Sequence, residues 1–158
     1  MGHYGNAQIC INGHVITSIG NDAQFMKKFC TDCGATTIMN CPDCNTAIKG
    51  LYIGDSFGFQ DYNPPSFCEN CGQPYPWTKS KKEAAAELID FADKLDDKEK
   101  LELKNSIDDL IVDTPKTPIA EMKFKKYALK AGSEIAKGLK DILIDLVSET
   151  VKKSIWNT

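Results

Sequence analysis

FCTDCG at residues 29–34 and FCENCG at residues 67–72 repeat one pattern, in which two cysteines stand three positions apart. Two other close pairs open the segments that these patterns close: Cys10 with His14, and Cys41 with Cys44. All seven cysteines of the 158-residue chain belong to these four pairs, and one histidine completes the set. A closed structural zinc site takes four nitrogen or sulfur ligands, so eight ligands predict two Zn²⁺ ions.

A disulfide framework and an iron–sulfur cluster are the competing explanations for the cysteines. A secreted scaffold would leave one of seven thiols unpaired, and no basic-then-apolar signal segment opens the chain. The histidine and the even division into pairs argue against an iron–sulfur cluster. We therefore expect reduced thiolates that bind zinc in a cytoplasmic protein.

The order in which the four pairs combine is a separate prediction. Sequential order gives two ligand sets: Cys10, His14, Cys30 and Cys33; and Cys41, Cys44, Cys68 and Cys71. We favour this order because adjacent elements tend to pack together in small domains. A cross-brace, as in RING-type modules, and a nested arrangement of the middle pairs remain open. His14 is preferred to His3 as a ligand, since His3 lies in a glycine-flanked terminus expected to be mobile.

The chain changes character at residue 79, which predicts an α+β protein with two domains. Residues 1–78 form a double zinc-ribbon domain, and residues 79–158 form a helical domain. The β-branched runs 15–19 and 36–38, with 51–53, are the expected strands of small hairpins. Nothing between the ligand pairs could bury a sizeable core, so zinc removal should unfold this domain.

Hydrophobic periodicity predicts about four helices after residue 79. The first apolar stripe is Ala84, Leu88, Phe91, Ala92 and Leu95, and the second is Leu103, Ile107, Leu110 and Ile111. Asp96 and Glu99 form a capping-box motif, Thr117 and Ser133 are expected caps of the last two helices, and Gly132 should end the third. The last helix should run unbroken from residue 133 to about residue 151.

No run of apolar residues in the sequence approaches the about 20 that span a bilayer, and no membrane partner is expected.

Aromatic residues gather around the last ligand pair. The candidate partner-binding residues among them are Phe57, Phe59, Tyr62, Tyr75 and Trp77. They either form a small core over the second ribbon or present an exposed face to a protein partner, at which tyrosine and tryptophan are favoured anchors. The apolar stripe of the last helix is a candidate homodimer interface.

Charge and ligand count limit the possible functions. Residues 1–78 contain three lysines and six acidic residues, the helical half balances sixteen lysines with sixteen acids, and arginine is absent. Nucleic-acid binding needs a basic surface and is disfavoured. Four protein ligands leave no open zinc position for water, and no other catalytic motif is found.

We expect a non-enzymatic zinc-binding interaction module or adaptor with an unknown protein partner. A nucleic-acid-associated regulator and a RING-like ubiquitin-type ligase module are the alternatives.

Four motifs follow one another along the first 78 residues. They are Cys-x-Asn-Gly-His at 10–14, the doubled Phe-Cys-x-x-Cys-Gly, Cys-Pro-x-Cys at 41–44 and Pro-Tyr-Pro-Trp at 74–77. The stretches 113–118 and 148–150 extend it into the helical half. The chain thereby resembles an uncharacterised bacterial family with paired zinc ribbons, catalogued as a domain of unknown function. The resemblance implies a bacterial cytoplasmic protein with two structural zinc ions and carries over no activity or substrate.

Overall fold

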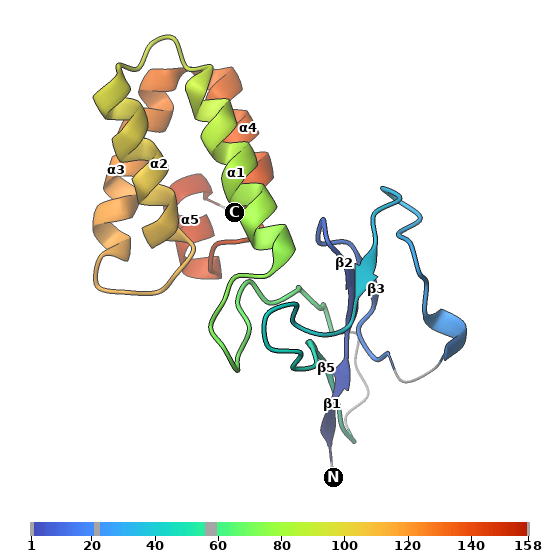
Figure 1. Ribbon diagram of the computed structural model, residues 1–158. Coiled ribbons are helices and arrows are strands. Elements are labelled where there is room, and N and C mark those ends of the chain that lie inside the picture. The colour runs from blue at the N-terminus through green and yellow to red at the C-terminus, as the bar shows by residue number, and fades with distance from the viewer. Residues whose placement is uncertain (1, 21–22, 56–59, 158) are drawn as a thin grey trace. The chain divides into compact units, whose positions relative to one another are not determined.

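The chain divides into two compact units, Met1–Ser80 and Lys81–Thr158. The computed structural model describes residues 2–20, 23–55 and 60–157, and the predicted partner-binding residues Phe57 and Phe59 lie outside these ranges. Short antiparallel strands make up the first unit and helices the second, so the fold class is α+β as predicted (Figure 1). No helix in the described ranges combines the length and apolarity needed to cross a bilayer.

Two small antiparallel sheets form the first unit. Its strands are β1 (His3–Asn6), β2 (Gln8–Cys10), β3 (Val15–Thr17), β4 (Thr37–Ile38) and β5 (Lys49–Ile53), and a 3₁₀ turn, η1 (Ala23–Phe25), follows β3. One sheet pairs β1 with β5, and the other has the order β3-β2-β4. His3 lies opposite Ile53 in the β1–β5 ladder. The expectation of a mobile terminus is therefore wrong, because strand pairing orders it.

The backbone after β3 passes very close to the β1–β5 sheet. The Leu51 N–H donates a hydrogen bond to the Ser18 carbonyl at 2.9 Å. A Cβ atom on Gly50 would lie 2.1 Å from that same carbonyl oxygen, and one on Gly20 would lie 2.1 Å from the Asn6 carbonyl oxygen. Backbone packs directly against backbone here, so glycine at these two positions lets the two sheets meet.

One apolar cluster joins both predicted ribbons. Its buried members are Ala7, Ile9, Cys41, Ile48, Cys68, Tyr75 and Trp77. Residues before the first ligand pair and residues between the later pairs thus share a core. Neither ribbon alone has enough apolar area for a core of its own, so the ribbons fold as one unit instead of two independent modules.

The buried aromatics correct one prediction. Tyr75 and Trp77 are each 2% exposed, and their rings stack with centroids 4.6 Å apart. The Trp77 indole N–H donates to the Pro65 carbonyl at 2.9 Å, which satisfies its polar atom inside the core. These two residues belong to the aromatic core and cannot serve as exposed anchors for a partner.

Five helices occur in the described residues. They are α1 (Pro76–Asp90), α2 (Asp97–Leu110), α3 (Thr117–Ala131), α4 (Ser133–Leu143) and α5 (Glu149–Trp156). The predicted last helix is therefore two helices. Leu146 and Val147 lie in the break between them and are both buried, and the Ser148 side chain caps α5. Burial of these apolar side chains in a turn lets α5 fold back onto α3, where Trp156 meets Phe124 edge to face at 5.9 Å.

The apolar stripe of α2 is confirmed, whereas that of α1 is wrong in register. Leu103, Ile107 and Leu110 are buried as expected. Along the predicted stripe of α1 the buried positions are Ala85 and Ile89, not Ala84 and Leu88. Ala92 and Leu95, which follow the helix, are buried as expected. Phe91 lies beyond the helix end at Asp90 and is 75% exposed. The predicted stripe runs through the helix end, where the turn after Asp90 breaks the helical periodicity.

Of three predicted helix ends, one is confirmed and two differ by one residue. Gly132 ends α3 with φ 105°, as expected. Thr117 is the first residue of α3 rather than its cap, and its hydroxyl donates to the Val112 carbonyl at 2.8 Å. Ser133 is the first residue of α4, and the N-cap position belongs to Gly132. In both cases the cap lies one residue earlier than predicted, within the usual uncertainty of helix ends.

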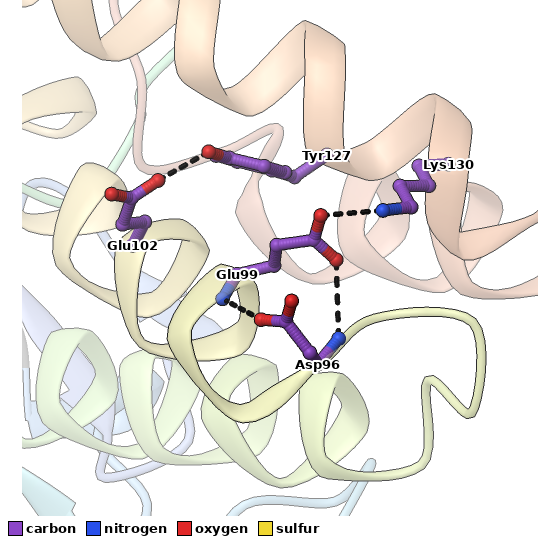
Figure 2. A network of polar contacts seen from close by, with 5 residues as sticks. All are labelled: Asp96, Glu99, Glu102, Tyr127 and Lys130. Atoms are coloured by element: carbon purple, nitrogen blue, oxygen red, sulfur yellow. Dashed lines mark hydrogen bonds and ion pairs between the residues drawn. The ribbon is translucent and has the colours of Figure 1, made fainter.

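A polar network joins the start of α2 to the end of α3 (Figure 2). The predicted capping box is present: the Glu99 N–H donates to the Asp96 carboxylate at 2.8 Å, and the Asp96 N–H donates to the Glu99 carboxylate at 3.1 Å. Lys130 pairs with the same Glu99 carboxylate, and the Tyr127 hydroxyl donates to Glu102. The hydrogen bond from Lys130 lowers the pKa of Glu99. Glu99 therefore caps the start of α2 and also holds the end of α3 against it.

The capping box supplies a test of this packing. Replacing Asp96 by alanine should lower the free energy of unfolding by about 1 kcal/mol, since the Glu99 N–H loses its acceptor. Urea denaturation followed by helical circular dichroism measures the change. Asp97→Ala is the matched control, because Asp97 is the next residue and makes no capping hydrogen bond. Equal losses in the two variants would contradict the role of the box.

Candidate metal centres

Three of the four ligand pairs have the same backbone conformation, which we call a knuckle. In each, the N–H four residues after the first cysteine donates back to that cysteine's carbonyl: Gly34 to Cys30, Asn45 to Cys41, and Gly72 to Cys68, at 2.8 to 2.9 Å. The first cysteine's own N–H donates to the carbonyl five residues ahead in every case. The fourth residue after the first cysteine always has positive φ, between 63° and 74°. These shared bonds fold the two sulfurs of each knuckle toward one point.

The pair Cys10 and His14 is built differently. It stands at the end of β2, and the loop between the two residues turns at Gly13, whose φ is 96°. The Cys10 N–H donates to the His14 carbonyl at 3.0 Å, so the loop is closed like the end of a hairpin. The His14 N–H in turn donates to Cys10 Sγ at 3.3 Å. The longer side chain of histidine is thereby aimed at the same side as the thiol.

The eight ligand atoms gather in two groups, Cys10, His14, Cys30 and Cys33, and Cys41, Cys44, Cys68 and Cys71. Within each group all four ligand atoms lie within 4.8 Å of one another. This is the sequential order, so neither the cross-brace nor the nested arrangement occurs. His3 belongs to neither group.

The spacing of the ligand atoms fits one tetrahedral ion in each group. Bonds of about 2.3 Å place the sulfurs of a tetrahedron about 3.8 Å apart. Cys10 and Cys33 Sγ are 3.7 Å apart, and Cys44 and Cys68 Sγ are 3.6 Å apart. His14 Nδ1 lies 3.4 Å from Cys10 Sγ, consistent with the shorter bond to nitrogen.

Both competing explanations of the cysteines fail on these distances. All seven cysteines are free, and a disulfide would need sulfurs about 2.05 Å apart. A multi-iron cluster spreads its ligands over several metal atoms, whereas each group here surrounds a single point. The chemistry is therefore that of two mononuclear sites, one with three sulfurs and one nitrogen and the other with four sulfurs.

Hydrogen bonds to sulfur favour the thiolate form that a metal requires. In the first group the Asn12 amide donates to Cys33 Sγ at 3.4 Å. The pKa of Cys33 is lowered to about 6, first by its backbone hydrogen bond with Ala35 and then by Asn12. In the second group the pKa of Cys44 is lowered to about 6, chiefly by the hydrogen bond with the Thr46 hydroxyl. Backbone hydrogen bonds also lower the pKa of Cys68, whereas burial raises that of Cys10, and the pKa of Cys71 is raised to about 12. A bound divalent cation would favour ionisation of all of them.

The aromatic core lies directly behind the second group. Tyr75 is buried against Cys68, and burial together with that contact raises its pKa. Tyr62 is half-buried, packs on the same core and donates its hydroxyl hydrogen to the Lys49 carbonyl at 2.6 Å. Apolar packing on one side keeps water away from Cys41 and Cys68, both of which are buried. The second ligand group and the apolar core of this unit therefore lie side by side and share Cys41 and Cys68.

All eight residues of the two groups are the ones that the sequence predicts as ligands, but several contacts that support them are not predicted by it. The knuckle formed by Cys41 and Cys44 does not match the repeated sequence pattern, because Asn45 stands where the other two knuckles have glycine. Asparagine tolerates the left-handed conformation better than most residues, and this was the available signal. The Asn12 and Thr46 contacts depend on side-chain positions that no spacing rule specifies.

Two closed four-ligand sites on short β-ribbons, followed by a helical unit, define a double metal-ribbon protein. The chain belongs to a bacterial family, as its motifs suggested: residues 3–155 match the family described as "Uncharacterized protein conserved in bacteria (DUF2321)". No curated protein and no solved structure matches the chain. Membership therefore brings no activity with it, and the site must be interpreted from its own chemistry.

The equivalence of the three knuckles leads to a prediction. Gly72→Asn should cost only a few tenths of a kcal/mol, because Asn45 occupies the same position in its own knuckle. Gly72→Val should cost about 1 to 2 kcal/mol, since a β-branched residue resists positive φ. A Cβ at this position meets no atom within 4 Å, so the difference reports backbone strain alone.

The measurement is the chelator concentration that releases half of the bound metal. It should fall for Gly72→Val and remain near the wild-type value for Gly72→Asn. Equal effects of the two substitutions would mean that the left-handed turn is unimportant for metal retention.

Proposed function

We propose that the protein binds two structural zinc ions and acts as a non-enzymatic interaction module. The observation that carries the zinc assignment is the closed four-ligand geometry of both groups. Tetrahedral sets of sulfur, or of sulfur with one imidazole, are the usual ligands of structural zinc. A mononuclear iron site is the alternative for the four-sulfur group, and it would absorb visible light.

The proposal of a structural rather than catalytic role rests on coordination. Catalytic zinc keeps three protein ligands and an open position for water, whereas both groups here offer four ligands. Zinc would therefore supply folding free energy, on the order of 10 kcal/mol per structural site. Free thiols in such sites suit a reducing compartment, which supports a cytoplasmic location.

Metal analysis tests this directly. Elemental analysis of purified protein should find two zinc ions per chain, one for each group. Cys44→Ser should lower the content to one ion, because only the second group loses a ligand. Strong chelators should abolish the near-ultraviolet signal of Trp77 while leaving most of the helical signal of the second unit intact. Iron in place of zinc, or a content of one ion or none in the wild type, would refute the assignment.

An interaction role is supported by a preorganised apolar segment in the first unit. Gln8, only 6% exposed, donates to the Lys27 carbonyl at 2.7 Å and accepts from the Lys27 N–H at 3.1 Å. The segment around Lys27 is thus held like a strand by a buried amide. Phe25 and Phe29, on either side of it, are about half exposed. Aromatic side chains displayed on a rigid segment bind partners at low entropic cost.

The interaction test compares matched variants. The tagged protein is used to capture partners from a lysate of its source bacterium, with stoichiometry read from the recovered bands. A protein recovered in fixed ratio by the wild type should be lost with Phe25→Ser/Phe29→Ser and kept with Phe91→Ser, which removes a still more exposed ring from the second unit.

Two outcomes would contradict the interaction role. Identical recoveries for all variants would show that the segment around Lys27 is not the contact surface. Binding of DNA or RNA that weakens steeply with salt would favour the nucleic-acid-associated alternative.

A further inference from the structure

The outer face of α3 carries charge of one sign. Five lysines are exposed there: Lys116, Lys123, Lys125, Lys126 and Lys130. The one carboxylate of this helix, on Glu121, is partly buried and accepts a hydrogen bond from Ser154 at 2.6 Å. The exposed faces of α2 and α4, by contrast, mix lysines with acids. The positive charge is therefore local, although the unit as a whole balances its charges.

Most of these lysines have no carboxylate partner. Lys130 pairs with Glu99, and Lys125 reaches only the Ser154 hydroxyl, at 3.4 Å. Within the described residues Lys116, Lys123 and Lys126 make no ion pair; the Lys126 ammonium lies 5.3 Å from the Tyr127 ring centre. Three unpaired ammonium groups on one helix face are available to an anionic partner.

Large apolar side chains stand on the same face. Ile119, Met122 and Leu129 are 56%, 73% and 81% exposed. With Lys126 they follow a spacing of three, four and three residues, which lines them up along one stripe of the helix. Lys123 and Lys130 flank the stripe on one side and Lys125 on the other. The opposite face, with Phe124 and Tyr127, is buried in the helical unit.

We propose that this outer face of α3 is a docking site for an acidic amphipathic helix of a partner protein. The partner's apolar residues would cover Ile119, Met122 and Leu129, and its carboxylates would meet the flanking lysines. This combination of an apolar stripe and cationic borders is complementary to a helix with the inverse pattern. The proposal is independent of the metal centres, since every residue involved lies in the second unit.

Other occupants fit the face less well. A second copy paired through the same face would set lysines against lysines, because a two-fold interface is self-complementary. A nucleic-acid partner would gain little from the exposed Ile, Met and Leu side chains, because aliphatic groups cannot stack on bases as aromatic rings do. Beside the stripe a groove of about 290 Å³ separates α3 from α2, and Glu102 and Asp109 line its α2 wall. A flat bilayer surface could not follow this groove, whereas the side chains of a helix can reach Ile119 and Lys123 on its α3 wall.

A designed peptide serves as the probe. It has about 18 residues, with leucines at helical spacing and glutamates on both sides of them. Its partner peptide has lysine in place of every glutamate. The intact, metal-loaded protein should bind the glutamate peptide saturably, with a Kd on the order of 10 to 100 μM, and the lysine peptide at least about tenfold more weakly.

Charge reversal then tests the location. Lys123→Glu/Lys126→Glu should weaken binding of the glutamate peptide at least about tenfold and strengthen binding of the lysine peptide. Met122→Ser/Leu129→Ser should weaken binding of both. Lys79→Glu/Lys137→Glu, which reverses two exposed lysines on α1 and α4, should leave both affinities unchanged. The exchange of peptide preference is an outcome that misfolding could not produce.

Several results would overturn the proposal. One is the absence of saturable binding to the glutamate peptide. Another is a loss of affinity with Lys79→Glu/Lys137→Glu that equals the loss with Lys123→Glu/Lys126→Glu. Binding to vesicles of phosphatidylcholine and phosphatidylglycerol, lost with Met122→Ser/Leu129→Ser while the peptide stays unbound, would assign the face to a bilayer. A concentration-dependent dimer in sedimentation that Lys123→Glu/Lys126→Glu abolishes would assign it to a second copy.

Discussion

Convergence of four ligand side chains on each of two points is the constraint on which the first unit depends. Its strands are two to five residues long, and its apolar cluster is small. Sheets of this size do not hold together without further support. The knuckles carry six of the ligands, and the stacked Tyr75 and Trp77 pack beside Cys41 and Cys68. A bound ion would therefore connect segments that are distant in sequence and hold the unit as one body.

Different interactions stabilise the two units. In the first, hydrogen bonds to sulfur and closed backbone turns position the ligands beside a small apolar cluster. In the second, helices bury conventional apolar faces, and the network around Glu99 joins α2 to α3 with polar bonds at the periphery. This difference explains why loss of metal should affect one unit far more than the other.

The surfaces of the two units also differ in what they could recognise. The first unit is acidic overall, and Gln8 holds a segment that displays Phe25 and Phe29. The second displays lysines with apolar side chains along α3. Two such unlike surfaces would each select a different partner chemistry.

The sequence by itself determined the eight candidate ligands, the capping box at Asp96 and the apolar face of α2, because each depends on spacing within one turn or one helix. Tertiary structure decided which pairs meet, that the N-terminal segment is a strand, and that Tyr75 and Trp77 are buried. It also decided the register of α1 and the break between α4 and α5. These features depend on contacts between distant segments, and local patterns carry no information about what packs against them.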